Sequence, residues 1–132
     1  MLVVDASCLY EVVADTTQAE EIRGRLADDE DHAAPHLIDV EVLNVVRRQY
    51  LQGRLDATAA LQAVEDLGAW PGERFGHRPL LSRAWELRDL VRGWDAVYVA
   101  LAEALGATLI TTDERLSRVL GLGCPTELFP AR

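Results

Sequence analysis

The sequence predicts an α/β fold in which a central, mostly parallel sheet of four or five strands lies between two layers of helices. Short apolar runs such as 2–4 and 108–111 alternate with longer segments whose apolar residues recur every three or four positions. This alternation is typical of a parallel sheet covered on both faces. The chain has 132 residues, of which 49% are hydrophobic. We therefore expect a single domain over residues 1–132, with a core that needs no disulfides.

Strands and helices alternate from the first residues onward. The apolar run 2–4 is typical of a strand buried on both faces, Pro35 ends a second short run, and Gly53 ends a long helix. In chain order we expect a strand at 2–4, helices at 6–14 and 16–28, a strand at 32–34, a helix at 37–50, and a helix from 56 or 58 to 68. The buried positions of the helix at 37–50 should be aliphatic, namely Val40, Leu43, Val45 and Val46.

The alternation resumes after a less regular segment. Residues 69–77 contain Pro71, Gly72 and Gly76, and they predict at most an edge strand. In chain order we then expect a helix at 79–91 with Leu80, Ala84, Leu87 and Val91 inward, a helix at 94–105 ended by Gly106, a strand at 108–111, a short helix at 116–120, a turn at 121–125 and a strand at 126–129.

The charge composition excludes several classes of function. Asp and Glu outnumber the basic residues by 22 to 13, the formal net charge is −9, and every basic residue is arginine. Without lysine the chain can form neither a phosphate-binding P-loop nor a Schiff base. A protein this acidic should not bind nucleic acid over its whole surface. A local basic patch, bound cations or a basic partner would still permit such binding.

Cysteine and histidine usage points to no disulfide or metal framework. Cys8 and Cys124 are too few for a disulfide scaffold and lack metal-type spacing, so we expect reduced thiols, with Cys8 in the core. His32, His36 and His77 also lack ligand spacing. No basic leader and no apolar run of membrane-spanning length is found. We expect a cytoplasmic protein that does not enter a membrane.

Two carboxylates follow apolar strands of the predicted sheet. Asp5 comes directly after the strand at 2–4, and Asp113 comes shortly after the strand at 108–111. Sites in open α/β sheets form beyond the carboxyl ends of the strands where the strand order reverses. These two side chains therefore converge if the strands are neighbours. Asp95, at the start of a helix, and Glu41, in an otherwise apolar stretch, are candidates to join them.

Each carboxylate also has a structural interpretation. Asp5 and Asp113 precede helices and would suit N-caps, Asp95 would be favoured by a helix dipole, and Glu41 would suit a solvated helix face. If the four converge instead, they repel one another and require a cation to stay ionised. Carboxylate oxygens are the ligands that Mg²⁺ and Mn²⁺ prefer. Such a site can activate water and clamp a phosphodiester.

The chain resembles the PIN-domain ribonucleases, and among them the VapC toxins of type II toxin–antitoxin pairs. The resemblance rests on residues 3–7 (VVDAS), the helix around Glu41 at 35–48, residues 94–102 (WDAVYVALA) and residues 109–113 (LITTD), and it covers essentially the whole chain. It implies a three-layer α/β/α PIN-like fold. The acidic quartet of the family maps onto Asp5, Glu41, Asp95 and Asp113, with supporting hydroxyls at Ser7 and Thr112.

The resemblance implies an endoribonuclease that depends on Mg²⁺, with Mn²⁺ as an alternative. Asp5 and Asp95 would be the direct metal ligands, and Glu41 and Asp113 would complete the site through water or a second ion. The implied substrate is RNA. The implied protein partners are an antitoxin that covers the cleft and a second copy of the chain in a homodimer. The candidate contacts to RNA phosphates are arginines, namely Arg47, Arg48 and Arg92.

Two other functions fit parts of the same pattern. A phosphohydrolase with Asp5 as its nucleophile needs a second acid two residues later, where this chain has Ser7. A protein-binding module would keep the fold and retain only a vestigial acidic cleft. A metal-dependent RNase assay with an Asp5→Asn control separates these alternatives.

Overall fold

The computed structural model describes residues 1–130, in which five strands form one parallel sheet. The strands lie in the order β3-β2-β1-β4-β5, and each neighbouring pair is parallel. Their bounds are Leu2–Val4 (β1), His32–Pro35 (β2), Glu73–Phe75 (β3), Thr108–Thr111 (β4) and Thr126–Leu128 (β5). The predicted α/β class and parallel sheet are confirmed.

The strand order reverses at β1, the central strand. The chain passes outward from β1 through β2 to β3 and later places β4 on the opposite side of β1. Leu2, Val3 and Val4 pair with Thr108, Leu109 and Ile110. The carboxyl ends of β1 and β4 therefore lie side by side, at the position where open α/β sheets form their sites.

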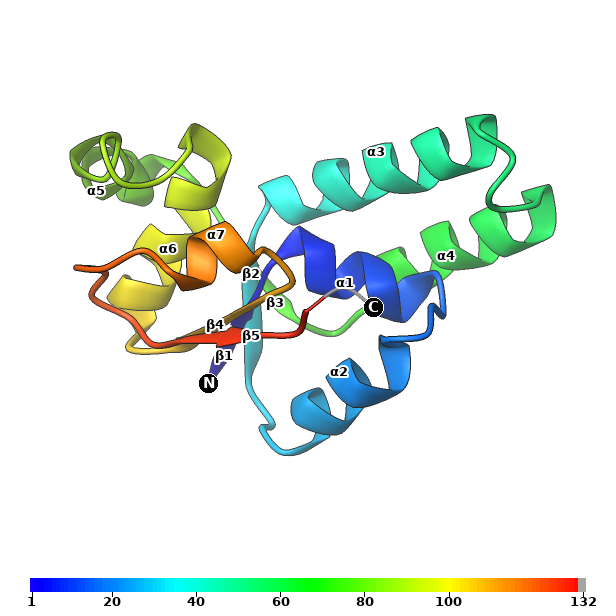
Figure 1. Cartoon of the computed structure of the whole chain (residues 1–132), viewed down its shortest axis with the longest axis horizontal. Coiled ribbons are helices and arrows are strands. Elements are labelled where there is room, and N and C mark those ends of the chain that lie inside the picture. The colour runs from blue at the N-terminus through cyan, green and yellow to red at the C-terminus, as the bar shows by residue number, and fades with distance from the viewer. Residues whose placement is uncertain (131–132) are drawn as a thin grey trace.

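Helices cover both faces of the sheet (Figure 1). On one face α6 (Gly93–Leu105) contacts β1, β2 and β4, and α5 (Leu81–Glu86) packs against α6. On the other face α1 (Ala6–Val13) contacts β4 and α2 (Ala19–Ala27). Figure 1 shows α3 (Leu37–Leu51) and α4 (Ala57–Ala69) extending together beyond the sheet. Within residues 1–130, no helix combines the length and apolar character that crossing a membrane requires.

The predicted helix at 79–91 is wrong in its extent. A 3₁₀ turn at Arg78–Leu80 leads into α5, which ends at Glu86, and residues 87–90 form turns. In these turns backbone N–H groups bond to carbonyls three residues back, as from Leu90 to Leu87, and this tightening ends the α-helix. The predicted inward register is confirmed for three buried side chains, those of Leu80, Leu87 and Val91.

Three other boundaries differ from the predictions for local reasons. The helix predicted at 16–28 begins at Ala19, because the preceding turn contains Asp15 at φ 52°. Pro35 belongs to β2 as its last residue, and the next bond to β3 is donated by the N–H of His36. The last helix, α7, spans Glu114–Ser117 rather than 116–120, because Asp113 caps it.

The prediction for the buried face of α3 is partly wrong. Val46 is buried and Val45 is half-buried, whereas Val40 and Leu43 are 55% and 47% exposed. The reason is that α3 extends beyond the sheet and packs mainly on α1 and α4, which cover one narrow stripe. An apolar groove remains between α3 and α4, lined by Leu43, Asn44, Val46, Arg47, Tyr50, Ala60, Leu61 and Val64.

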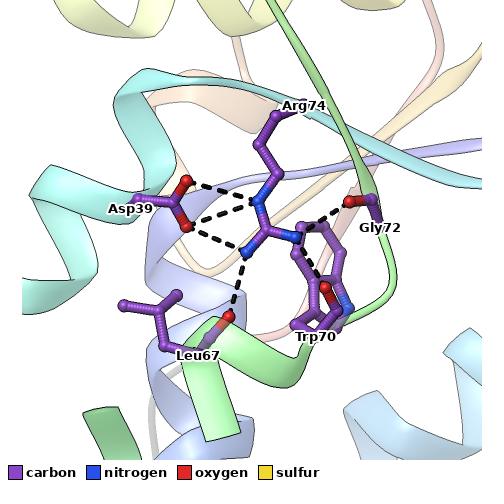
Figure 2. Close-up of polar contacts among 5 residues, drawn as sticks. All are labelled: Asp39, Leu67, Trp70, Gly72 and Arg74. Atoms are coloured by element: carbon purple, nitrogen blue, oxygen red, sulfur yellow. Dashed lines mark hydrogen bonds and ion pairs between the residues drawn. The ribbon is translucent and has the colours of Figure 1, made fainter. Parts of the chain in front are cut away.

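Arg74 joins β3 to this helix pair (Figure 2). Its guanidinium donates to the Asp39 carboxylate on α3, with Nη2 and Oδ1 2.9 Å apart, and to the carbonyls of Leu67, Trp70 and Gly72. Its central carbon lies 4.8 Å from the Trp70 ring centre. Every guanidinium N–H therefore has a partner, which suits a side chain that is only 16% exposed.

Candidate active site

Asp5 is the buried centre of the candidate site. It follows β1, it is 6% exposed, and its backbone N–H donates to the carbonyl of Ile110 on β4. Its Oδ2 accepts hydrogen bonds from the hydroxyls of Thr111 at 2.7 Å and Ser7 at 3.1 Å. Burial raises the pKa of Asp5, while the two hydroxyls lower it. The hydroxyls therefore fix the orientation of a carboxylate that burial alone would destabilise.

The same hydroxyls connect Asp5 to the residues after β4. Thr111 Oγ1 accepts from the N–H of Asp113 at 3.0 Å, and Ser7 Oγ accepts from the N–H of Thr112 at 3.1 Å. Asp113 also caps α7, because its Oδ1 accepts from the N–H of Arg115 at 2.9 Å. Asp113 thus has the capping role considered from the sequence. Its charge also acts on Asp95; together with Asp5 and Glu41 these two residues form what we call the acidic cluster.

Asp95 enters the site from the first turn of α6. Together with Asp113 it lines a pocket of about 190 Å³, which we call the acidic pocket. Burial raises the pKa of Asp95 to about 6, and the charges of Asp5 and Asp113 contribute to that rise. The charges of Arg92 and Arg115 act in the opposite direction. Asp95 therefore lies within electrostatic range of both strand-end carboxylates.

Glu41 approaches the same cluster from α3. Burial raises its pKa to about 7, and the charges of Asp5 and Asp95 contribute. Within the described part of the chain, its Oε1 and the hydroxyl of Tyr98 on α6 are buried atoms without a hydrogen-bond partner. The Tyr98 hydroxyl nevertheless lies near enough to lower the pKa of Glu41. Two polar groups without hydrogen-bond partners therefore lie close together beside Asp5 and Asp95.

The donor chemistry of this cluster fits a hard divalent cation. No three acidic, imidazole or thiolate side chains among residues 1–130 form a ready-made coordination group for one metal ion. However, burial and the charges of neighbouring carboxylates disfavour the ionised forms of Glu41 and Asp95, and Glu41 Oε1 lacks a hydrogen-bond partner. A cation would relieve both conditions, and carboxylate oxygens are what Mg²⁺ and Mn²⁺ prefer. Coordination would require side chains of the cluster to rotate toward the ion.

The predicted RNA contacts do not all lie at this cluster. Arg92 lines the acidic pocket. Arg47 instead lines the groove between α3 and α4, and Arg48 lines a neighbouring pocket on α3 with Arg47 and Leu51. Thr112 contributes its backbone N–H to the network around Asp5, where the sequence had suggested its hydroxyl.

Histidine and cysteine side chains take structural positions. His77 Nε2 accepts from the N–H of Leu37 at the start of α3, and His32 Nε2 lies 2.8 Å from the carbonyl oxygen of Leu26. Cys8 is fully buried, and burial raises its thiol pKa, as expected for a core residue. Cys124 is half-buried, and both cysteines are free thiols.

Three residues of the site are not among those predicted from the sequence. Thr111 looks like an ordinary β-branched residue at the end of an apolar strand, so its sequence context carried no signal. Tyr98 lies three residues after Asp95, and this helical spacing places both on one face of α6. Arg115 lies two residues after Asp113 on α7. The last two spacings were available signals that pointed toward the cluster.

Comparison with known proteins identifies the family to which this site belongs. The family model described as "PIN domain" matches residues 2–122, which include all four carboxylates. The chain therefore belongs to the PIN-domain family. Its similarity to individual members identifies it further as VapC-type.

Curated relatives match over nearly the whole chain. Ribonuclease VapC3 of Mycobacterium tuberculosis is 42% identical over 118 residues, covering 89% of this chain and 85% of the relative. Ribonuclease VapC1 of the same organism is 38% identical over 128 residues, covering 96% of each.

Solved structures share the fold. PAE2754 from Pyrobaculum aerophilum has a TM-score of 0.68 at 25% identity, covering 95% of this chain and 82% of that one. VapBC2 from Rickettsia felis, solved bound to a DNA fragment from the promoter, has a TM-score of 0.69 at 14% identity, covering 97% and 98%. At this identity the second similarity concerns the fold alone.

Proposed function

We propose that the protein is a Mg²⁺-dependent endoribonuclease, with Mn²⁺ as an alternative ion, that acts as the toxin of a toxin–antitoxin pair. The observation that carries the proposal is the convergence of carboxylates at the β1–β4 switch point. There burial raises the pKa of Glu41 and of Asp95; the charges of Asp5 and Asp95 add to the rise at Glu41, and those of Asp5 and Asp113 add to the rise at Asp95. The names of the VapC relatives, each called a ribonuclease, support the same function.

In this proposal each residue of the cluster has a distinct task. Asp5 and Asp95 are the residues that would hold the cation directly, with Glu41 and Asp113 completing the site through water or a second ion. When bound, a divalent cation lowers the pKa of water and stabilises charge on a phosphate. Ser7 and the residues after β4 keep Asp5 in one orientation, which limits the reorganisation that cleavage requires.

The geometry disfavours the alternative of a phosphohydrolase with Asp5 as its nucleophile. Asp5 is only 6% exposed, and its Oδ2 already accepts two hydroxyl hydrogen bonds. An attacking carboxylate must approach phosphorus closely, which this burial opposes. The residue two positions later is Ser7 and not an acid, which also counts against a phosphohydrolase.

The test of the proposed function is cleavage of single-stranded RNA by the purified protein. We expect cleavage with Mg²⁺ or Mn²⁺, none in EDTA, and none by Asp5→Asn or Asp95→Asn that remain folded by circular dichroism. Undiminished cleavage in EDTA would refute the metal dependence. Release of phosphate from small esters would favour the phosphohydrolase. Neither activity would favour a binding module.

We further propose that an antitoxin binds the groove between α3 and α4 and extends over the acidic cluster. Leu43, Tyr50, Leu61 and Val64 are all exposed on this groove, and neighbouring exposed apolar side chains are typical of a protein-binding surface. The net charge of −9 favours a partner with basic residues near the carboxylates. Growth inhibition by the chain alone, relieved by co-expression of its small neighbouring gene product, would support this pairing.

A homodimer is the remaining part of the proposal. Leu81, Trp85 and Leu90, on and after α5, are 56%, 69% and 50% exposed. Leu81 and Trp85 line one shallow pocket, and neighbouring exposed apolar side chains are typical of an interface. Sedimentation should give a dimer mass for the wild type, and Trp85→Glu should shift it toward the monomer.

A further inference from the structure

The acidic pocket is bordered by cations as well as carboxylates. Its lining combines two arginines, two aspartates and an apolar wall, namely Leu90, Val91, Arg92, Asp95, Asp113, Arg115, Leu116 and Val119. Its volume of about 190 Å³ lies below the roughly 300–1,000 Å³ of sites for whole small molecules. A pocket of this size suits one unit of a polymer rather than a separate metabolite.

Within residues 1–130, six arginines donate to a carboxylate or a carbonyl, and the two arginines of the pocket do not. Arg25, Arg74 and Arg83 each donate to a carboxylate. Within residues 1–130, by contrast, the guanidinium groups of Arg92 and Arg115 make no hydrogen bond or ion pair, and both residues are exposed. In a chain with nine more acidic than basic groups, two unpaired cations beside carboxylates leave their donors available for an external anion.

Backbone contacts hold the two arginines on separate elements of the pocket. Arg92 is the N-cap residue of α6, and its carbonyl accepts from the N–H of Ala96. Arg115 lies in α7, where its own N–H donates to Asp113. Their positions are thus fixed relative to Asp95 and Asp113, and their charges act on Asp95.

We infer that Arg92 and Arg115 together bind RNA phosphates next to the phosphodiester that is cleaved. The inference deepens the proposed ribonuclease function and rests on it for the identity of the polymer. A cluster of carboxylates repels a polyanion, so a nuclease of this charge needs local cations to bring the strand to the site. Arginine suits this task because its planar fork can donate two hydrogen bonds to one phosphate.

The experiment compares Arg92→Gln, Arg115→Gln and the double variant with wild type and with Arg118→Gln. Arg118 follows α7 and lies outside the pocket, so its variant removes the same charge from nearby. One arm measures binding of a fluorescein-labelled, single-stranded RNA of mixed sequence in EDTA over a series of salt concentrations. The other measures kcat and KM for cleavage of the same RNA with Mg²⁺.

For each pocket variant we expect a rise of about 3- to 10-fold in both Kd and KM, with kcat within about twofold of wild type. Each should reduce the slope of log Kd against log salt by about 0.7, the value for one phosphate contact on a single strand. Arg118→Gln should stay near wild type. Pocket variants that match Arg118→Gln in Kd and salt slope would overturn the inference.

The binding and cleavage measurements distinguish a failure of the phosphate contacts from a failure of the proposed ribonuclease function. Wild-type protein that binds RNA through both arginines and never cleaves it would refute the ribonuclease and retain the phosphate contacts. Cleavage with unchanged KM in the double variant would retain the ribonuclease and refute the contacts. A loss confined to kcat would assign the arginines to the cleavage step and also overturn the binding role.

Discussion

The hydroxyl of Thr111 donates a hydrogen bond to Asp5 Oδ2 at 2.7 Å, and this contact joins the ends of two strands that are 106 residues apart in sequence. Thr111 Oγ1 in turn accepts from the N–H of Asp113 at 3.0 Å. Thr111 is fully buried. One side chain therefore sets the position of Asp5 and of the backbone at Asp113 at once.

Thr111→Val should therefore weaken both the fold and the site. The change keeps the shape and removes the hydroxyl, so that a buried carboxylate loses a donor and a backbone N–H loses its acceptor. We expect the free energy of unfolding to fall by about 1–3 kcal/mol and RNA cleavage to fall with it. Urea denaturation and an RNase assay measure the two effects.

Thr111→Ser is the matched control, because it restores the hydroxyl without the methyl group. It should recover most of the cleavage that Thr111→Val loses. If Val and Ser at this position are equally active, the hydrogen bond to Asp5 has no part in positioning the site.

The order of strands and helices follows from residue patterns because short apolar runs and helical spacing are local signals. The pattern predicted β1 and β4, and their adjacency is what brings Asp5 and Asp113 together. The position of Asp95 at a helix start was equally visible in the sequence. These predictions succeed because local residue patterns determine them.

Other features depend on tertiary neighbours and left no local trace. The exposure of Val40 results from α3 extending beyond the sheet, and the helix predicted at 79–91 ends early where its hydrogen bonds tighten. The role of the Thr111 hydroxyl depends on the meeting of β1 and β4, whereas the helical spacing of Tyr98 from Asp95 was visible in the sequence. Spacing within one segment cannot report contacts made between segments.

Glu41 should make the metal-free protein less stable as the pH rises. Its pKa is raised to about 7 in the folded state from an ordinary value of 4.5, so the folded state binds this proton more tightly than the unfolded state. The resulting stabilisation is complete below about pH 4.5 and is lost as the pH rises through 7. Because Glu41 is partly exposed and coupled to its neighbours, we expect a loss of about 1–2 kcal/mol.

Urea denaturation in EDTA at mildly acidic and mildly alkaline pH measures this loss. Glu41→Gln should flatten part of the profile, leaving the contributions of Asp95 and Asp5, whose pKa values are also raised. Glu65→Gln removes the same charge from an exposed position of α4 and should follow wild type. A wild-type profile that rises with pH over this window would contradict the raised pKa.

Arg74 should stabilise the fold by more than its ion pair with Asp39 alone accounts for. Arg74→Ala removes a donor from the carbonyls of Leu67, Trp70 and Gly72, of which Leu67 keeps the N–H of Trp70, and we expect a loss of about 2–4 kcal/mol. Asp39→Asn removes only the carboxylate charge, which is 42% exposed, and should cost about 0.5–1 kcal/mol. Urea midpoints compare the two. Equal losses would mean that the carbonyl contacts of Arg74 add nothing.

Divalent cations should stabilise the folded protein through the acidic cluster. When the carboxylates of the cluster are ionised, their negative charges repel one another. A cation that binds only the folded state offsets this repulsion. At free Mg²⁺ about tenfold above its dissociation constant, the gain is about 1.4 kcal/mol, or a rise in Tm of roughly 3–8 °C for a domain of this size. Because protons compete with the ion for Glu41 and Asp95, the rise should shrink as the pH falls below about 6.

The control for this effect is the double variant Asp5→Asn, Asp95→Asn, which removes two carboxylates at the centre of the cluster and keeps their size. Its own Tm without metal should equal or exceed that of wild type, because repulsion is relieved, and Mg²⁺ should leave it nearly unchanged. Thermal unfolding monitored by circular dichroism with and without Mg²⁺ measures both. An equal rise in wild type and double variant would mean that Mg²⁺ only screens the surface charge of −9, and that the carboxylates do not form a cation site.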